Sequence, residues 1–440
     1  ARGSRYRHVA TLRYQNRTSL APGTWIRSAT QSCDRATVYT GAGVASAAWP
    51  STNRLAAVEC YTGQGCPAAG VQVMAAHHEL VQRIKAHRSM ALAEEHTYAP
   101  SFNGPEGQED MPWLLTMGPV TTSRDVKLAM LADWSMRDTE FVSLALEVTE
   151  QLLDLVDGTS EYDCIPLHLS GDAMLESVLG ALSPTGRKRK TLIAAHGPYA
   201  EQATSILTHL KRPVEKISGS ALRPITTNRL SKVLEADPDI HTVYLAEVDI
   251  STGLSNPVAK LAAIAHEAGR KVIVDARASI GAIPFSLATG TVDAVIAVPW
   301  ACLESVPGFS FVMVRRSLLT DTLFQSPSAS LDLIELWKGI HRTGWFPGTP
   351  PAHAIVACGV ALRRLYLEGG PEMRRKRYQE HHVRLLSGMA QLGFSPTLAE
   401  GTATCGYLTL FKAPADRRYS PAQFIQRLRQ MGFVIMDGDG

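Results

Sequence analysis

Residues 241–275 read HTVYLAEVDISTGLSNPVAKLAAIAHEAGRKVIVD, and this stretch decides the fold. An apolar strand at 241–248 is followed by a helix at 257–269 and by a second apolar strand, Lys-Val-Ile-Val-Asp, at 271–275. A strand, a helix and a second strand in close succession form the unit that builds parallel sheets. Because both strands are apolar almost throughout, we expect them to be covered on two faces.

The same alternation continues on either side of this stretch. We expect helices at 138–156, 173–182 and 199–210, and strands at 163–167, 191–195, 292–298 and 309–314. Asp172 is placed to cap the second of these helices. The pattern predicts an α/β fold with a mainly parallel, doubly wound sheet in a large domain over 111–330.

The rest of the chain divides into three further segments. After 330, helices and a strand at 406–411 predict a smaller α+β domain over 331–440. We interpret 74–110 as an amphipathic helix and a linker. Residues 1–73 show no sustained period. They are interpreted either as a disordered basic arm or as translated upstream sequence that is no natural domain.

Charge and cysteine usage restrict the function classes. The chain carries 44 Lys and Arg against 41 Asp and Glu, and its basic excess lies in 1–73, so charge gives no argument for nucleic acid. Its seven cysteines show no metal-ligand spacing, which predicts no metal site and a reducing compartment. With neither a signal segment nor a long apolar run, we expect a cytoplasmic protein without membrane contact.

Ligands of open parallel sheets bind at the carboxyl ends of the strands. Three such places carry chemistry here, and one of them is the Val306-Pro307-Gly308-Phe309 turn before an apolar strand. Ser170-Gly171-Asp172 opens a helix, where backbone N–H groups favour a phosphate, although the carboxylate opposes one. Asp275 ends the apolar strand at 271–275. Its carboxylate can cap a loop, or it can pair with the protonated ring nitrogen of an electron-sink cofactor.

Several segments, in one order along about 113–436, resemble a known family. They are residues 115–123 (LTMGPVTTS), 251–257 (STGLSNP), 273–284 (IVDARASIGAIP), 302–309 (CLESVPGF) and 432–435 (GFVI). Together they resemble the 2-aminoethylphosphonate:pyruvate transaminases, which are class V, fold-type I enzymes dependent on pyridoxal 5'-phosphate. The family reaction moves the amino group of 2-aminoethylphosphonate to pyruvate and gives phosphonoacetaldehyde and alanine.

The resemblance implies roles for particular residues. It places Ser170, Gly171 and Asp172 in the phosphate loop, Tyr199 on the face of the cofactor ring and Asp275 at the pyridine nitrogen. It further implies cofactor contacts from Asp249, Thr252 and Trp300, a phosphate contact from Thr349 across a homodimer, and substrate contacts from Thr121, Thr122 and Ser123.

The family pattern breaks at its reactive lysine. The family has this lysine just before the Val306-Pro307-Gly308-Phe309 turn, where this chain has Trp300 and Ala301. An alanine forms no Schiff base and moves no proton. Of the twelve lysines, Lys338 is the substitute whose place the sequence leaves open. The family's substrate-carboxylate arginine is expected beyond Gly440, so the small domain is expected to be incomplete.

Two functions follow from this comparison. The first is an aminotransferase of the aminoethylphosphonate type, impaired at Ala301. The second is a pseudoenzyme that acts by binding, as a homodimer or as a dimer partner of an active paralogue.

Overall fold

The computed structural model describes residues 112–158, 161–186, 188–217, 219–344 and 346–438, together with three strands nearer the N-terminus. The helix and linker expected at 74–110 lie outside the described residues. Contacts divide the chain into two units, 1–86 and 87–440, and each is described by itself. The boundary proposed near residue 330 stays a prediction.

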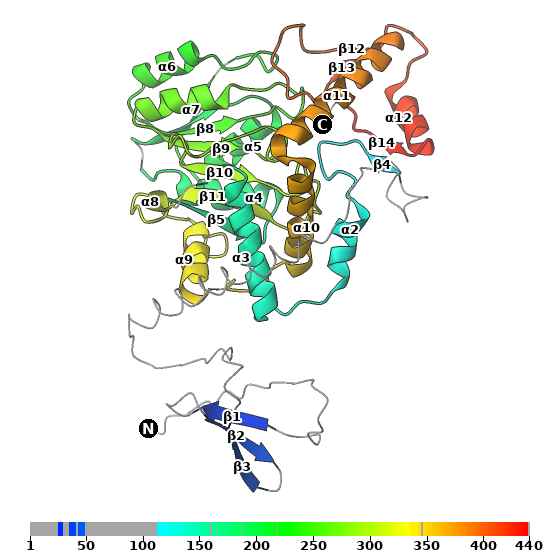
Figure 1. Cartoon of the computed structure of the whole chain (residues 1–440). Coiled ribbons are helices and arrows are strands. Elements are labelled where there is room, and N and C mark those ends of the chain that lie inside the picture. The colour runs from blue at the N-terminus through cyan, green and yellow to red at the C-terminus, as the bar shows by residue number, and fades with distance from the viewer. Residues whose placement is uncertain are drawn as a thin grey trace. The chain divides into compact units, whose positions relative to one another are not determined.

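A seven-stranded sheet forms the centre of the second unit (Figure 1). Its strands, in order across the sheet, are β5 (Tyr162–Leu167), β11 (Ser310–Arg315), β10 (Ala294–Ala297), β9 (Lys271–Asp275), β8 (Ile240–Ala246), β6 (Lys190–Ala194) and β7 (Val214–Lys216). Neighbouring strands from β10 to β7 pair in parallel. The expectation of a mainly parallel α/β sheet is therefore confirmed.

Strand β11 is the exception, because it runs antiparallel to both β10 and β5. The chain passes from β10 to β11 through residues 298–309 without an intervening helix. A parallel return needs a long crossover, usually helical, so this short connection turns the chain back instead. The sequence located this strand but did not predict its direction.

Helices cover both faces of the sheet (Figure 1). One face packs against α3 (Thr139–Asp154), α6 (Thr227–Ala236), α7 (Val258–Glu267) and α10 (Ala352–Glu368). The other packs against α4 (Gly171–Leu182), α5 (Gly197–His209), α8 (Arg316–Leu319) and α9 (Leu333–Thr343). Because strand side chains alternate between faces, Val272 and Val274 enter the first core and Ile273 the second. Asp275 therefore belongs to the α4–α5 side.

The remaining elements lie outside the central sheet. They are α2 (Arg124–Leu128), the 3₁₀ turn η1 (Ala129–Leu131), α11 (Gly370–Gln391), β12 (Ser395–Pro396), β13 (Phe411–Lys412), α12 (Pro421–Gln430) and β14 (Phe433–Val434). β14 pairs in parallel with β4 (Trp113–Leu114). Residues 113–114 and 433–434, which are far apart in the sequence, therefore lie side by side, a pairing that the sequence did not predict.

Two expected elements differ in detail. Helix α4 begins at Gly171, with Ser170 in the N-cap position, so Asp172 lies in the first turn and is not the cap. The strand expected at 406–411 is reduced to β13 at Phe411–Lys412, which pairs only with the two residues of β12. Gly406 has a φ of +81°, a left-handed conformation that interrupts an extended strand.

The first unit contains a three-stranded antiparallel sheet of β1 (Trp25–Ala29), β2 (Arg35–Thr40) and β3 (Gly43–Ala48). It lies in the segment where the sequence showed no sustained period. Both interpretations of residues 1–73 stay predictions.

Candidate functional site

Polar side chains gather where β8 and β9 end, on the side of the sheet that α4 and α5 cover. Asp275 closes β9, and its side chain is fully buried. Tyr244 of β8 lies on the same face, because Ala246 pairs with Asp275 in the parallel register. The Tyr244 hydroxyl donates a hydrogen bond to Asp275 Oδ2. The carboxylate is thus fixed from the sheet side.

Arg277, two residues beyond the strand, neutralises this carboxylate. Its Nε donates to Asp275 Oδ1 at 3.0 Å and to Oδ2 at 2.9 Å, and its Nη2 donates to Oδ2 at 2.7 Å. The arginine side chain is only 4% exposed. Burial opposes its charge, but the Asp275 carboxylate more than offsets this effect, so the pKa of Arg277 is raised above its ordinary value. The guanidinium therefore keeps its charge although it is buried.

Tyr199, in the first turn of α5, forms the second wall of the cluster. The guanidinium carbon of Arg277 lies 3.8 Å from the centre of the Tyr199 ring, within the range of a cation–π contact. Burial raises the pKa of the Tyr199 phenol, so the ring stays neutral. Two of the residues expected to contact a cofactor, Tyr199 and Asp275, are thus brought together by one arginine.

The expected phosphate loop joins this cluster through Gln202 of α5. Gln202 Oε1 accepts a hydrogen bond of 2.9 Å from Arg277 Nη2, and its Nε2 donates to Asp172 Oδ1. Ser170, Gly171 and Asp172 are all exposed at the N-terminus of α4. A carboxylate therefore lies at the helix end where a phosphate would bind.

Ala301 and Trp300 follow β10 at the same edge of the sheet. Ala301 is 3% exposed and belongs to the core on the α4–α5 side, against which Tyr199 and Trp300 also pack. The segment before α2 lies on Trp300. A Cβ at Gly118 would be 2.8 Å from the indole ring, and Val120 N–H donates to the Trp300 carbonyl at 3.4 Å. The side chain at position 301 is therefore only a methyl group, which offers no amine to this part of the site.

Asp249 lies in the loop after β8 and is 2% exposed. Its Oδ1 accepts from Ser251 N at 2.8 Å and from Ser251 Oγ at 2.6 Å, while Oδ2 has no hydrogen-bond partner among the described residues. The backbone of Gly197, with a φ of +72°, passes directly against this carboxylate. The Asp249 carboxylate therefore accepts hydrogen bonds within its own loop and lies against the first residue of α5.

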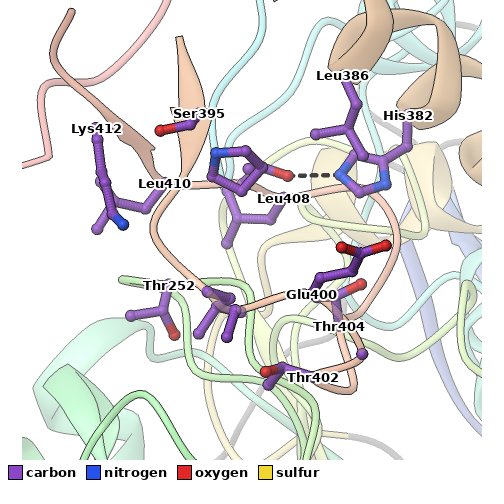
Figure 2. A pocket seen from close by; sticks show the side chains of 15 residues that line it. Thr252, His382, Leu386, Ser395, Glu400, Thr402, Thr404, Leu408, Leu410 and Lys412 are labelled. Atoms are coloured by element: carbon purple, nitrogen blue, oxygen red, sulfur yellow. Dashed lines mark hydrogen bonds between the residues drawn. The ribbon is translucent and has the colours of Figure 1, made fainter. Parts of the chain in front are cut away.

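Thr252 lies apart from the Asp275 cluster, in the wall of a cavity of about 570 Å³ (Figure 2). Thr252 comes from the loop after β8, whereas the other labelled side chains come from α11 and from residues 395–412. His382 Nε2 and Thr409 Oγ1 are in hydrogen-bond contact at 2.5 Å. None of Asp275, Tyr199 or Ala301 lines this cavity.

The expected substrate contacts and Thr349 have local roles or exposed positions. Thr121 Oγ1 accepts a hydrogen bond of 2.7 Å from Leu114 N, and Ser123 Oγ donates to Asp125. Thr122 is buried. Thr349 is exposed in the loop between α9 and α10. These positions leave the expected substrate and partner contacts as predictions.

Sequence reasoning missed three members of the cluster. Arg277 follows Asp275 at a spacing of two, in the turn after the strand, and Gln202 follows Tyr199 by about one helical turn, which places Gln202 on the same side of α5 as Tyr199. Tyr244 lies on the inward face of an apolar strand. An arginine two residues after an acid that ends a strand was the available signal.

A second buried acid lies close by. Glu247, which follows β8, accepts a hydrogen bond from the Ser279 hydroxyl. Burial raises the pKa of Glu247 to about 7, although the Ser279 hydrogen bond and the charge of Arg375 act in the opposite direction. This carboxyl group is therefore half protonated near neutral pH.

These residues do not fit pyridoxal phosphate bound in the way that the resemblance implies. Ala301 offers no amine for a Schiff base, and Asp172 sets a negative charge at the phosphate loop. Both partners expected for the ring, Asp275 and Tyr199, are already engaged by Arg277. The misfit with pyridoxal phosphate therefore follows from the chemical groups that these residues present.

In the described part of the chain, no group of three His, Cys, Asp or Glu side chains is arranged to hold a metal ion. No helix in that part is both long enough and apolar enough to cross a membrane.

Comparison with known proteins gives the ancestry. Residues 135–409 match the family described as aminotransferase class-V. The 2-aminoethylphosphonate--pyruvate transaminase of Burkholderia pseudomallei (strain K96243) is 36% identical over 327 residues, which cover 74% of this chain and 88% of that protein.

Solved structures give the same fold. An alanine--glyoxylate aminotransferase from Nostoc sp. has a TM-score of 0.67 at 21% identity, covering 75% of this chain and 87% of that one. The pyridoxamine-pyruvate aminotransferase from Mesorhizobium loti has a TM-score of 0.66 at 23% identity, covering 76% and 85%. The fold-type I architecture expected from the sequence is therefore confirmed. On the family match and the identity to its relatives, this chain belongs to the class V aminotransferases, a family dependent on pyridoxal phosphate.

Proposed function

We propose that this chain is a class V aminotransferase homologue that no longer transaminates and acts by binding, as one subunit of a homodimer or of a heterodimer with an active paralogue. Ala301 is the observation that carries the proposal. Its methyl group is packed in the core at the position where the family resemblance implies the reactive lysine. Without an amine there, the covalent route to transamination is closed.

The positions of other lysines support this proposal. Lys338 is exposed and pairs with Glu335 at 2.7 Å. Its neighbour Trp337 donates to Asp163 near the amino end of β5, away from the carboxyl edge of the sheet. Lys271 begins β9 at the same amino edge and pairs with Asp293. Neither amine is placed to replace the missing one beside Asp275.

The extent of the likeness favours a second candidate, an impaired transaminase. The relatives that match over most of this chain are named for 2-aminoethylphosphonate and pyruvate. On this view the chain keeps their amine and oxo-acid substrates and turns them over slowly, with a lysine recruited from elsewhere. The two candidates differ in whether any lysine reacts with the cofactor.

The deciding experiment is a visible absorbance spectrum of the full chain with added pyridoxal phosphate, before and after borohydride. We expect only free-aldehyde absorbance that dialysis removes, and no alanine from 2-aminoethylphosphonate and pyruvate. The Burkholderia pseudomallei relative, treated in parallel, is the control for both assays. A borohydride-fixed adduct on one mapped lysine, or alanine formation above the level without protein, would favour the impaired transaminase.

A further inference from the structure

We infer that Arg277 is an internal substitute for the cofactor ring, so that this chain fills its own ring site with a side chain. The inference goes beyond the loss of the lysine, because a site without a lysine could still hold the ring non-covalently. It concerns the two groups that would do so, Asp275 and Tyr199.

The first property that the Arg277 guanidinium shares with the cofactor ring is a hydrogen bond to the acid Asp275. A protonated pyridine ring presents one N–H donor and one positive charge to its carboxylate partner. The guanidinium presents the same charge with more donors, and three of its contacts to Asp275 lie between 2.7 and 3.0 Å. With Tyr244 and the Arg277 backbone N–H also donating to this carboxylate, its oxygens are fully engaged.

The second shared property is a flat shape. A guanidinium is planar and stacks on aromatic faces, as a pyridine ring does. The separation of 3.8 Å between the Arg277 guanidinium carbon and the Tyr199 ring centre is contact distance, which leaves no room for a ring between them. Gln202 holds the free edge of the guanidinium at 2.9 Å.

An added cofactor ring would therefore compete with Arg277 for Asp275, and we expect Arg277 to be favoured. A cofactor ring could reach Asp275 only by displacing a side chain that is attached two residues away and is already desolvated. Displacement would also leave the Arg277 charge without its partner. The apoprotein is then the complete protein, because its own arginine supplies the cation that the acid and the aromatic ring require.

The test measures binding of pyridoxine, which has the ring of the cofactor but neither its aldehyde nor its phosphate. Pyridoxine therefore reacts with no lysine and avoids the Asp172 carboxylate. The proteins compared by equilibrium dialysis are the unsubstituted chain, Arg277→Ala and Arg277→Met. Arg374→Met is the matched control, because Arg374 is also buried and its ion pair with Glu368, at 2.8 Å, involves neither Asp275 nor Tyr199.

We expect both Arg277 variants to bind pyridoxine with a Kd at least roughly tenfold lower than the unsubstituted chain and the Arg374 control. The inference is overturned if the unsubstituted chain binds pyridoxine as tightly as the variants, or if neither variant gains affinity. Should the variants fold poorly, their thermal midpoints are measured with and without pyridoxine. A rise in midpoint for Arg277→Ala and Arg277→Met, and none for Arg374→Met, supports the inference, and equal responses refute it.

These outcomes are separate from those that test the proposed function. That proposal fails on a lysine adduct or on alanine formation by the unsubstituted chain. The pyridoxine measurement detects neither of them.

Discussion

Replacing Asp275 by Asn should destabilise the chain strongly, since it removes the counter-ion of a buried cation. The two side chains are 0% and 4% exposed, and Asn keeps the volume of Asp. Breaking a buried ion pair from one side costs about 3–5 kcal/mol, because the remaining charge stays uncompensated. We therefore expect Asp275→Asn to lower the free energy of unfolding by about 4 kcal/mol, within that range.

The chain contains its own control for this prediction. Asp416 and Arg418 have the same spacing of two, and Arg418 makes the same pattern of three side-chain contacts, between 2.8 and 3.2 Å. This second pair is exposed, with Arg418 at 91%. Solvent screens exposed pairs, so Asp416→Asn should leave the unfolding midpoint unchanged within error. Because the two pairs share their spacing and their contact pattern, the difference between the two variants measures the effect of burial.

A double variant separates charge from packing. Asp275→Asn combined with Arg277→Met removes both charges and keeps most of the volume. We expect it to recover much of the stability that Asp275→Asn loses, because no buried charge then lacks a partner. A double variant as unstable as the two single changes added together would assign the loss to packing.

The assay is equilibrium urea unfolding, followed by both tryptophan fluorescence and circular dichroism. Coincident transitions are required before free energies are compared. If Asp275→Asn costs no more than Asp416→Asn, the reasoning is wrong. The Asp275–Arg277 pair would then not hold the site together.

Three further predictions concern other residues. Ala301→Lys alone should give no alanine from 2-aminoethylphosphonate and pyruvate in an assay coupled to alanine dehydrogenase, because Arg277 still fills the ring site, and clear turnover would contradict this. Burial raises the pKa of Glu247 from 4.5 to about 7, so the folded state keeps a proton that the unfolded chain releases, and stability falls by roughly 3 kcal/mol as pH rises between these values. Glu247→Gln should abolish this slope in urea titrations at several pH values. Gly197→Ala should lower the thermal midpoint by calorimetry, since it forces a left-handed φ and presses a Cβ on Asp249, at a cost of about 1–2 kcal/mol.

The fold could be predicted because its signals are local. Alternating apolar strands and helices at 241–275 fix a βαβ unit, and handedness and burial then leave few arrangements of the sheet. What depended on partners far along the chain could not be predicted. The reversed direction of β11 and the pairing of β14 with β4 are set by contacts between residues that no periodicity connects.

The candidate site divides in the same way. The sequence alone placed Asp275 at a strand end and Tyr199 at a helix start, and its family resemblance implies that Ala301 stands where the reactive lysine would be. Only the tertiary structure decided that Arg277 lies between the acid and the aromatic ring. An arginine side chain is long enough to reach either solvent or a neighbouring group. Its direction is set by a buried carboxylate and an aromatic face that only the folded chain brings together. The sequence therefore determined that the chain descends from aminotransferases, and the packing around one arginine determined what fills the site that it inherited.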